Sequence, residues 1–391
     1  MGLAQYGGTR LYVTTTQELA EAVDQLMACS VVAIDTEFMR ERTYYSRLCL
    51  IQIAGGDHTF LIDPLGEINL DPLRPLLLDP KITKVFHAGT QDLEIFFNRF
   101  GEPVAPVFDT QLAATLIGYP EQVSYGSLVH GECGVQLEKT DGFTDWSKRP
   151  LTADQITYAR NDVTYLLRVY PLLQEKIASS GRQGWLDGEF ARMANRDTWE
   201  IDTREVWRKV KRISSLNPRA LAVVREIAEF REVESMRRNL PRRWVLPDEA
   251  IVQIAHRKPK SRDELEGIRG VTKVATSRAN EVLEAVRRAV ELPETELPSL
   301  ERTKRPSFDT DPGVDLVVAL VRQRAKDNNV AMSQLATRAQ IEEFVSSHGE
   351  RGVLNEGWRD AMVGEEARGL LAGELTLSLS QDTLVVERKT T

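Results

Sequence analysis

The stretch Val31-Val32-Ala33-Ile34-Asp35-Thr36-Glu37-Phe38 decides the fold class of this chain. Its first four residues are apolar and mostly β-branched, a composition typical of a buried strand. Asp35 and Glu37 follow at the carboxyl end. Because alternate side chains of a strand share a face, both carboxylates are expected on one side of the sheet. Open α/β sheets bind ligands beyond the carboxyl ends of their strands. The stretch therefore predicts an α/β domain with an acidic site at the end of a strand.

Two further segments carry acids in comparable positions. Residues 84–87 read as a second strand, and Asp92 follows it in the first turn of an expected helix. Another helix is predicted from a capping box at 152–155 with apolar residues at helical spacing behind it. Tyr158 and Asp162 lie four residues apart on that helix, so they share one face. A phenol beside a carboxylate can orient or help to deprotonate an attacking water.

A cluster of carboxylates needs a compensating partner, because like charges held close together repel one another. Paired divalent cations are a common partner, and they are a standard device for cutting phosphodiester bonds. Ligand sets made only of oxygen favour Mg²⁺ or Mn²⁺ over zinc. The acids therefore indicate a metal-dependent nuclease.

These segments resemble the three exonuclease motifs of the DEDD superfamily, in the subclass with tyrosine in the third motif. The intervening text is similar to bacterial ribonuclease D at residues 37–40, 43–45, 48–52, 109–111 and 145–151. The resemblance implies a ribonuclease H-like exonuclease fold and hydrolysis of RNA from its 3′ end, releasing nucleoside 5′-monophosphates. It also implies that Tyr158 orients the attacking water and that two divalent cations, Mg²⁺ or Mn²⁺, are held by Asp35, Glu37, Asp92 and Asp162.

Several other side chains are candidates for contact with the substrate. Tyr44 and Tyr45 could stack on the terminal base, a common device for single-stranded RNA, or could only close a loop. His87 lies at a strand end and is expected to be a hydrogen-bonded structural residue rather than a metal ligand. The full set of substrate candidates is Thr36, Tyr44, Tyr45, Gln91, Arg242, Arg243 and Trp244.

The net charge of −8 at pH 7 argues against a nucleic-acid enzyme unless the charge is uneven. Residues 203–270 hold 17 Lys and Arg against 10 Asp and Glu, a balance of +7, which leaves −15 on the rest of the chain. Cations interleaved with Trp244 suit phosphate contact and base stacking. A solvated helical face with paired charges would explain part of this region instead.

The chain is expected to divide into one α/β domain and two small all-α domains that resemble HRDC domains, which are nucleic-acid-binding modules. A connector with Trp185, Trp199 and Trp207 is expected to pack back on the α/β domain, and the tail from 381 is expected to be frayed. The α/β domain is expected to contain a mixed sheet flanked by helices. The predicted segments are the exonuclease domain 1–180, the connector 181–212, the first HRDC domain 213–292, a Pro-rich charged linker 293–312, and a second HRDC-like domain with the tail, 313–391.

Three cysteines are too few for a disulfide framework or a zinc site. No stretch approaches the ~20 apolar residues of a membrane span and no secretion signal is evident, so a cytoplasmic protein with no membrane contact and no obligate protein partner is expected. The family resemblance implies an RNA partner with a free 3′ end, such as transfer RNA precursors or small structured RNAs. A DNA 3′–5′ exonuclease and a non-catalytic RNA-binding protein on a nuclease scaffold remain alternatives, since spacing does not distinguish ribose from deoxyribose.

Overall fold

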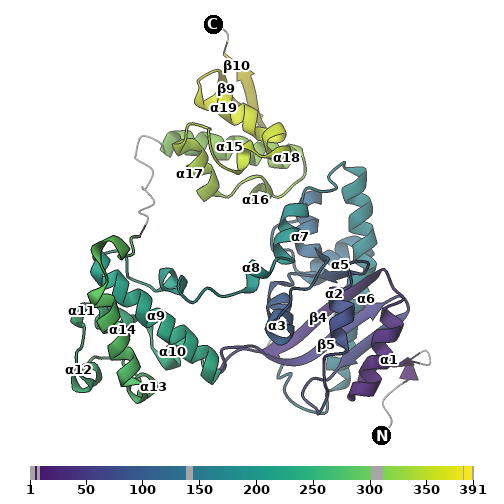
Figure 1. Cartoon of the computed structure of the whole chain (residues 1–391). Helices are drawn as coiled ribbons and strands as arrows, with labels where there is room; N and C mark the ends of the chain where they lie inside the picture. Colours follow the sequence, from purple (N-terminus) through teal and green to yellow (C-terminus); the bar gives the residue numbers. More distant parts are fainter. Residues whose placement is uncertain (1–4, 7–8, 138–143, 301–310, 382, 390–391) are drawn as a thin grey trace.

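A computed structural model describes residues 5–6, 9–137, 144–300, 311–381 and 383–389 of the chain. Figure 1 shows an α/β domain at lower right, a first helical domain at lower left, and a second helical domain at the top. No helix within these residues is both long enough and apolar enough to span a membrane. The predicted division into one α/β part and two helix-rich parts agrees with this arrangement.

A six-stranded mixed sheet forms the centre of the α/β domain, as predicted. Strand β4 is its pivot, because it pairs antiparallel with β5 and parallel with β7. The order across the sheet is β3-β6-β5-β4-β7-β8. The strands are β3 (Tyr12–Val13), β4 (Val31–Met39), β5 (Arg47–Gly55), β6 (His58–Ile62), β7 (Thr83–Phe86) and β8 (Val107–Asp109), and a separate small hairpin joins β1 (Gln5–Tyr6) to β2 (Thr9–Arg10).

Helices cover both faces of the sheet because the strands alternate their side chains between two apolar cores. Val32 and Ile34 pack in the core that also contains residues of the helices α1 (Thr16–Leu26), α2 (Leu73–Leu78) and α3 (Thr90–Phe100). Ala33 packs on the other face against α6 (Ala153–Ser179), whose capping box at Thr152 forms as predicted. Shorter helices, α4 (Thr110–Ala114), the turn η1 (Thr115–Ile117) and α5 (Tyr125–Cys133), lie beside α6. The small side chain of Ala33 lets α6 lie close to β4, which brings the predicted third motif to the first.

The connector contributes to more than one core. Trp199 packs at the edge of the α/β core, but Trp207 is fully buried in the core of the first helical domain, so the expectation that it packs back on the α/β domain is wrong. Val206 and Val210 beside it are buried in the same core, so this end of the connector packs on the first helical domain and not on the α/β domain. The connector elements are α7 (Asp187–Met193), α8 (Arg196–Trp199) and η2 (Val206–Lys209).

The first helical domain is organised around its longest helix, α9 (Pro218–Arg238), which Asn217 caps and Asn239 ends in the left-handed conformation. Helices α11 and α14 pack along α9. The remaining elements of this domain are α10 (Arg242–Val245), α11 (Asp248–Arg257), α12 (Arg262–Glu266), α13 (Lys273–Ser277), α14 (Ala279–Glu291) and the turn η3 (Glu294–Glu296).

The second helical domain ends in a β-hairpin, which corrects the prediction of an all-α domain with a frayed tail. Strands β9 and β10 pair antiparallel in register, and Leu377 and Val386 pack against the core of this domain. Leucines alternate with polar residues along β9, a pattern that lets one face of the hairpin pack on the domain. The elements are α15 (Asp311–Asp327), α16 (Met332–Leu335), α17 (Arg338–Ser346), η4 (Val353–Asn355), α18 (Gly357–Arg359), η5 (Asp360–Gly364), α19 (Glu365–Leu371), β9 (Leu375–Ser380) and β10 (Thr383–Arg388). Residues 301–310 of the predicted linker lie outside the described residues.

The second helical domain also contacts the α/β domain directly. The rings of Trp185 and Trp358 stack 4.1 Å apart between centroids, and Arg359 forms an ion pair with Glu189 at 3.1 Å. The backbone N–H of Ala331 donates to the carbonyl of Thr115, and the guanidinium of Arg182 donates to carbonyls of both domains. Trp185 thus contributes to the cores of two domains.

Candidate active site

The predicted acids converge where β4 lies under α6. Oxygen atoms of Asp35, Glu37 and Asp162 lie within 4.8 Å of one another, two from the strand and one from the helix. Asp92 lies in the first turn of α3, and its carboxylate is buried. It accepts a hydrogen bond from the hydroxyl of Thr36, the residue between Asp35 and Glu37, and so lies next to this group. The sheet therefore brings the three acidic motifs of the sequence together at one place.

The turn that aims Asp92 is held by a buried aspartate of the neighbouring strand. Asp109, at the end of β8, accepts the backbone N–H groups of Ala88 and Gly89 at 3.2 and 2.8 Å. A Cβ atom added to Gly89 would lie 2.4 Å from the Cβ of Phe86, so only glycine fits there. The turn into α3, and with it the position of Asp92, depends on these two residues.

Burial raises the pKa of every acid in the cluster, and repulsion within the cluster adds to the rise at two of them. Loss of solvent is the larger cause for each, and neighbouring carboxylates add to it at Asp35 and Glu37. The pKa of Glu37 rises to about 8, that of Asp162 to about 7 and that of Asp92 to about 6. The pKa of Asp35 lies well above its ordinary value. Without a compensating positive charge, the cluster retains protons near neutral pH.

Tyr158 lies beside Asp162, as the four-residue spacing predicts. Burial raises the pKa of Asp162, and a hydrogen bond from the Tyr158 side chain opposes that rise. The Tyr158 ring also packs against Trp146, 6.0 Å away between centroids. The phenol of Tyr158 is therefore held next to the Asp162 carboxylate, where it would be able to orient an attacking water.

Two residues of the site were not anticipated from the sequence. The hydroxyl of Tyr125, on α5, donates to the carbonyls of Asn161 and Asp162 and ties α6 down at the third motif. Gln52 is fully buried and lies directly opposite Asp35 across the β4–β5 pair, and neither polar end of its side chain finds a hydrogen-bond partner among the described residues. A glutamine inside an otherwise apolar strand was the signal that could have drawn attention to Gln52.

The donor set fits divalent cations. All candidate ligands are carboxylate oxygens, which suit Mg²⁺ or Mn²⁺. Asp162 Oδ2 is buried and accepts no hydrogen bond from any described residue, an arrangement that a cation would satisfy. Three independent features thus agree: the kind of atom, the separation of the oxygens and an unsatisfied acceptor.

The stability of the metal-free protein is expected to fall as pH rises from about 5 to 8. Glu37 and Asp162 keep their protons in the folded protein up to about pH 8 and 7, whereas the unfolded chain loses them near pH ~4. The folded state binds more protons than the unfolded chain in this window. The stability that these protons contribute is complete below the pKa of the acids in the unfolded chain, and it is lost as the pH rises through their pKa in the folded protein. Thermal unfolding in EDTA at several pH values should show a falling Tm, and Mn²⁺ should restore it most strongly at pH 8. The variant Glu37→Gln should flatten the slope; an equal slope in this variant would contradict the assignment.

Two substrate candidates, Thr36 and Tyr44, are buried in contacts within the protein, which argues against their predicted roles, and a third, Arg242, is paired but exposed. Thr36 is buried and donates to Asp92. Tyr44 is only 8% exposed and its hydroxyl donates to Glu232 of α9, so its ring is not available to stack on a base. Arg242 forms a two-pronged ion pair with the same glutamate. A partner from another element covers Thr36 and Tyr44, whereas the Arg242 side chain remains 46% exposed, so its contact with phosphate stays a prediction.

The other four substrate candidates, like Arg242, keep exposed surface. Gln91 is exposed at the start of α3, and Tyr45 is partly exposed next to the buried Tyr44. Arg243 is exposed, and Trp244 beside it is 51% exposed, which is unusual for so large an apolar side chain. Their contact with substrate stays a prediction.

His87 is a structural residue, as its position at a strand end predicted. One ring nitrogen lies 3.0 Å from the hydroxyl of Thr110 and the other 3.1 Å from the carbonyl of Val123. Burial lowers the pKa of the imidazole, which favours the neutral ring.

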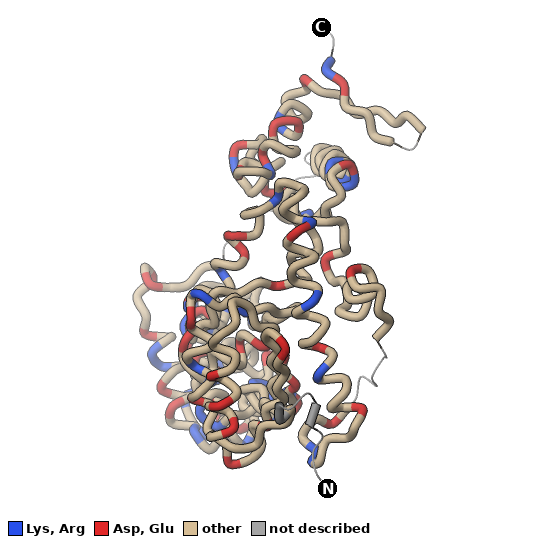
Figure 2. The backbone as a smooth tube through the Cα atoms, turned by 90° about the vertical axis from the view of Figure 1, so that its right-hand side faces the viewer, with Lys and Arg blue, Asp and Glu red and all other residues tan. Residues whose placement is uncertain are grey.

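Much of the positive charge in residues 203–270 is paired with acids of the same region. Arg204 contacts Glu226 at 2.8 Å, Arg262 contacts Glu266 at 2.7 Å, and Arg237 and Arg238 share Glu234. Figure 2 shows acidic and basic residues interspersed along the chain. In the ranges described, no ion pair involves Lys209, Lys211, Arg243, Arg257, Lys258 or Lys260. Fewer Lys and Arg side chains are therefore available for phosphate contact than the 17 counted in residues 203–270 of the sequence.

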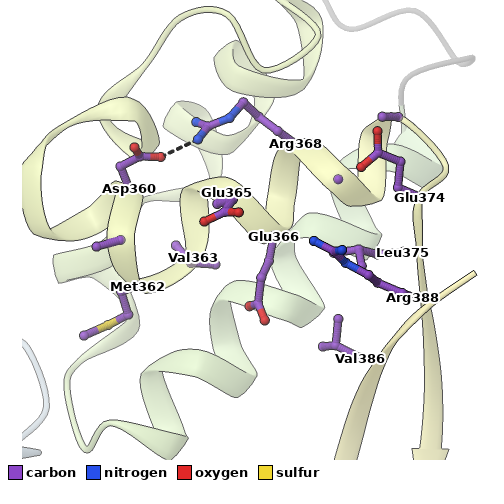
Figure 3. Close-up of a pocket in the computed structure, with 13 residues that line it drawn as sticks. Asp360, Met362, Val363, Glu365, Glu366, Arg368, Glu374, Leu375, Val386 and Arg388 are labelled. Atoms are coloured by element: carbon purple, nitrogen blue, oxygen red, sulfur yellow. Dashed lines mark hydrogen bonds and ion pairs between the residues drawn. The ribbon is translucent and has the colours of Figure 1, made fainter.

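A hollow of about 660 Å³ lies in the second helical domain, between α19 and the β9–β10 hairpin (Figure 3). Its lining combines apolar residues with four carboxylates and two arginines, and two of the carboxylates are already paired, Asp360 with Arg368 and Glu366 with Arg324. Glutamates on its wall do not suit a phosphate-bearing substrate, so the acid cluster of the α/β domain remains the candidate active site.

Comparison with protein families agrees with the geometry. Residues 11–178 match a family model described as a 3′–5′ exonuclease, and residues 220–286 match the model of the HRDC domain. These two matches cover the domain that holds the acid cluster and the helical domain built around α9.

Curated relatives match nearly the whole chain. Ribonuclease D of Jannaschia sp. (strain CCS1) is 37% identical over 383 residues, covering 96% of this chain and 99% of that protein. Ribonuclease D of Gluconacetobacter diazotrophicus is 38% identical and covers 94% of each chain.

Two solved structures are also similar to this chain. The crystal structure of Escherichia coli RNase D, an exoribonuclease involved in structured RNA processing, superposes with a TM-score of 0.79 at 33% identity, covering 93% of this chain and 98% of that one. The catalytic core of RRP6 from Trypanosoma brucei superposes with a TM-score of 0.54 at 25% identity over 72% of this chain and 79% of that one.

Proposed function

This chain belongs to the ribonuclease D family of 3′–5′ exoribonucleases, and from that premise we propose that it trims the 3′ ends of small structured RNAs, transfer RNA precursors among them, using two divalent cations. The observation that carries the proposal is the convergence of Asp35, Glu37 and Asp162 next to Tyr158. The products would be nucleoside 5′-monophosphates.

The acids would have separate tasks. Asp35, Glu37 and Asp162 would hold one cation, and Asp35 with Asp92 would hold the second. When bound, the cations would supply charge neutralisation at the scissile phosphate and would make the attacking water more acidic. Thr36 would keep the Asp92 carboxylate in place through the hydrogen bond described above.

Tyr158 would orient the attacking water. Its hydroxyl is held at Asp162, and its ring rests on Trp146, so the oxygen of the phenol has little freedom to move. A fixed hydroxyl can hold a water in line with the bond to the leaving 3′ oxygen, which reduces the entropy lost on reaching the transition state.

RNA is the substrate class that the relatives favour. The similar proteins are named ribonuclease D, and the similar Escherichia coli structure is described as taking part in structured RNA processing. The Lys and Arg side chains of residues 203–270 that form no ion pair with any described residue, together with the exposed Trp244, suit contact with phosphates and bases of such RNA. An RNA precursor as substrate would place the enzyme in the cytoplasm.

Digestion of matched RNA and DNA oligomers tests the proposal. Each oligomer is labelled at its 3′ or its 5′ end and incubated with Mg²⁺, Mn²⁺ or EDTA. Immediate release of labelled mononucleotide from the 3′ end of RNA, abolished by EDTA, is the expected result. Comparison of the two metals at equal concentration would identify the preferred cation.

The same digestion separates the alternatives. Faster release from DNA than from RNA would favour a DNA exonuclease with the same chemistry. Absence of cleavage with either metal, together with retained RNA binding, would indicate a binding protein and would leave the acid cluster without its proposed role.

A further inference from the structure

The connection between β4 and β5 contacts the first helical domain as well as the α/β domain. Residues 40–46 form this connection, and Figure 1 shows it reaching from the sheet toward α9 and α10. Tyr44 on it donates its hydroxyl to Glu232 of α9, and the backbone N–H of Tyr45 donates to Asn239 Oδ1 at 3.0 Å. Two consecutive residues of the connection are therefore bonded to a helix almost 200 positions later in the chain.

Glu232 is the centre of this contact. Its side chain is fully buried, and Arg242 of α10 grips its two oxygens at 2.7 and 2.6 Å. The same guanidinium lies 4.8 Å from the centroid of the Tyr44 ring. A buried carboxylate needs such partners, and here one of them comes from the α/β domain. The three side chains Tyr44, Glu232 and Arg242 are called the junction below.

The other side of the connection is tied to the helix that carries an acid of the active site. Arg40 donates to both oxygens of Glu94, at 3.0 and 2.9 Å, and Glu94 lies two residues after Asp92 on α3. The connection also begins three residues after Glu37, where β4 ends. The junction therefore meets the α/β domain next to the acid cluster rather than on a remote surface.

We propose that the junction is a positioning element, which holds the first helical domain at a set place beside the active site so that RNA bound to both domains presents its 3′ end to the acids. The inference rests on the proposed function and concerns which RNA substrates the enzyme cleaves with a low KM. A domain held in place gives the bound RNA a high effective concentration at the active site, whereas a domain released on a flexible connector does not. A substrate too short to reach the helical domain gains nothing from the junction.

The variant Glu232→Ala tests the inference in the full-length protein. We expect KM for a hairpin RNA with a single-stranded 3′ tail to rise about 10-fold or more, with kcat within about twofold of the original value. For a trinucleotide, kcat/KM should change by less than about twofold. Small-angle scattering should show a larger radius of gyration for the variant, because the helical domain is no longer held.

Two further variants test whether misfolding, rather than loss of the junction, explains the result. Tyr44→Phe removes one hydroxyl and should shift KM for the hairpin RNA in the same direction by a smaller factor. Glu232→Gln keeps an acceptor for the partners and should recover part of the original KM. The control Glu266→Ala removes an exposed glutamate of the same domain, paired with Arg262, and should leave both substrates unaffected.

The outcomes distinguish the inference from the function on which it rests. Equal losses on the hairpin RNA and the trinucleotide would mean that the junction supports the active site itself, and would overturn the positioning role. An unchanged KM in a variant whose radius of gyration has increased would overturn it as well. If the original protein cleaves neither substrate, the proposed function fails instead.

Discussion

Replacing Asp35 with asparagine is expected to reduce turnover on 3′-hydroxyl RNA by about 10³-fold or more, an effect of the size seen when transition-state charge stabilisation is lost. Asp35 is the acid proposed to contact both cations, so asparagine would weaken both sites at once. The substitution keeps the shape of the side chain and removes only its charge. Single-turnover kinetics at saturating Mn²⁺ would measure the loss of the chemical step.

Asp35→Asn should also make the metal-free protein more stable, which separates this effect from misfolding. The pKa of Asp35 is raised by burial and by repulsion from Asp92, Asp162 and Glu37, so a neutral side chain relieves an unfavourable interaction. Thermal unfolding in EDTA at pH 8 should show a higher Tm. The control Asp154→Asn, an exposed position on α6, should keep full turnover. Wild-type turnover in the Asp35 variant would disprove the two-cation assignment.

Replacing Tyr158 with phenylalanine is expected to lower kcat about 10²-fold, the lower range for loss of a group that assists proton transfer. Phenylalanine keeps the ring packed against Trp146 and removes only the hydroxyl that is held at Asp162. Because the hydroxyl is proposed to act on the water and not on the RNA, the Kd for RNA should stay within about twofold. Rapid-quench kinetics and equilibrium binding at the same metal concentration would measure the two quantities separately.

Tyr165→Phe provides the matched control on the same helix. Its ring contacts Arg168 and belongs to the edge of a different core, so loss of its hydroxyl should change neither kcat nor Kd. A loss of RNA binding equal to the loss of turnover in Tyr158→Phe would show that this tyrosine holds the substrate or the fold rather than the water.

The central part of the site could be predicted because each piece of it has a local signature. Alternation along residues 31–38 places Asp35 and Glu37 on one face of a strand, and helical spacing places Tyr158 and Asp162 on one face of a helix. These periodicities depend only on neighbouring residues, so they can be read without knowledge of the fold. Convergence of the two pieces followed from the family resemblance, and the small side chains of Ala33 and Ala54 between β4, β5 and α6 show how it is achieved.

The surface roles could not be predicted in the same way. Tyr44 and Arg242 have the composition of an RNA-binding surface, yet Glu232, 188 positions after Tyr44, engages both of them. The positive count of residues 203–270 likewise includes several arginines that acids of the same domain neutralise. Exposure and pairing depend on which distant surfaces meet, and no local pattern records that.

The sequence by itself therefore determined the kind of chemistry: which acids, which tyrosine and which elements carry them, because strand and helix periods are properties of adjacent residues. Only the tertiary structure decided which of the remaining polar residues are buried or paired and which stay exposed. It also revealed Gln52 opposite Asp35, Tyr125 beneath α6 and the hairpin of β9 and β10. The physical reason is that burial and charge pairing are settled by contacts between segments far apart in the chain.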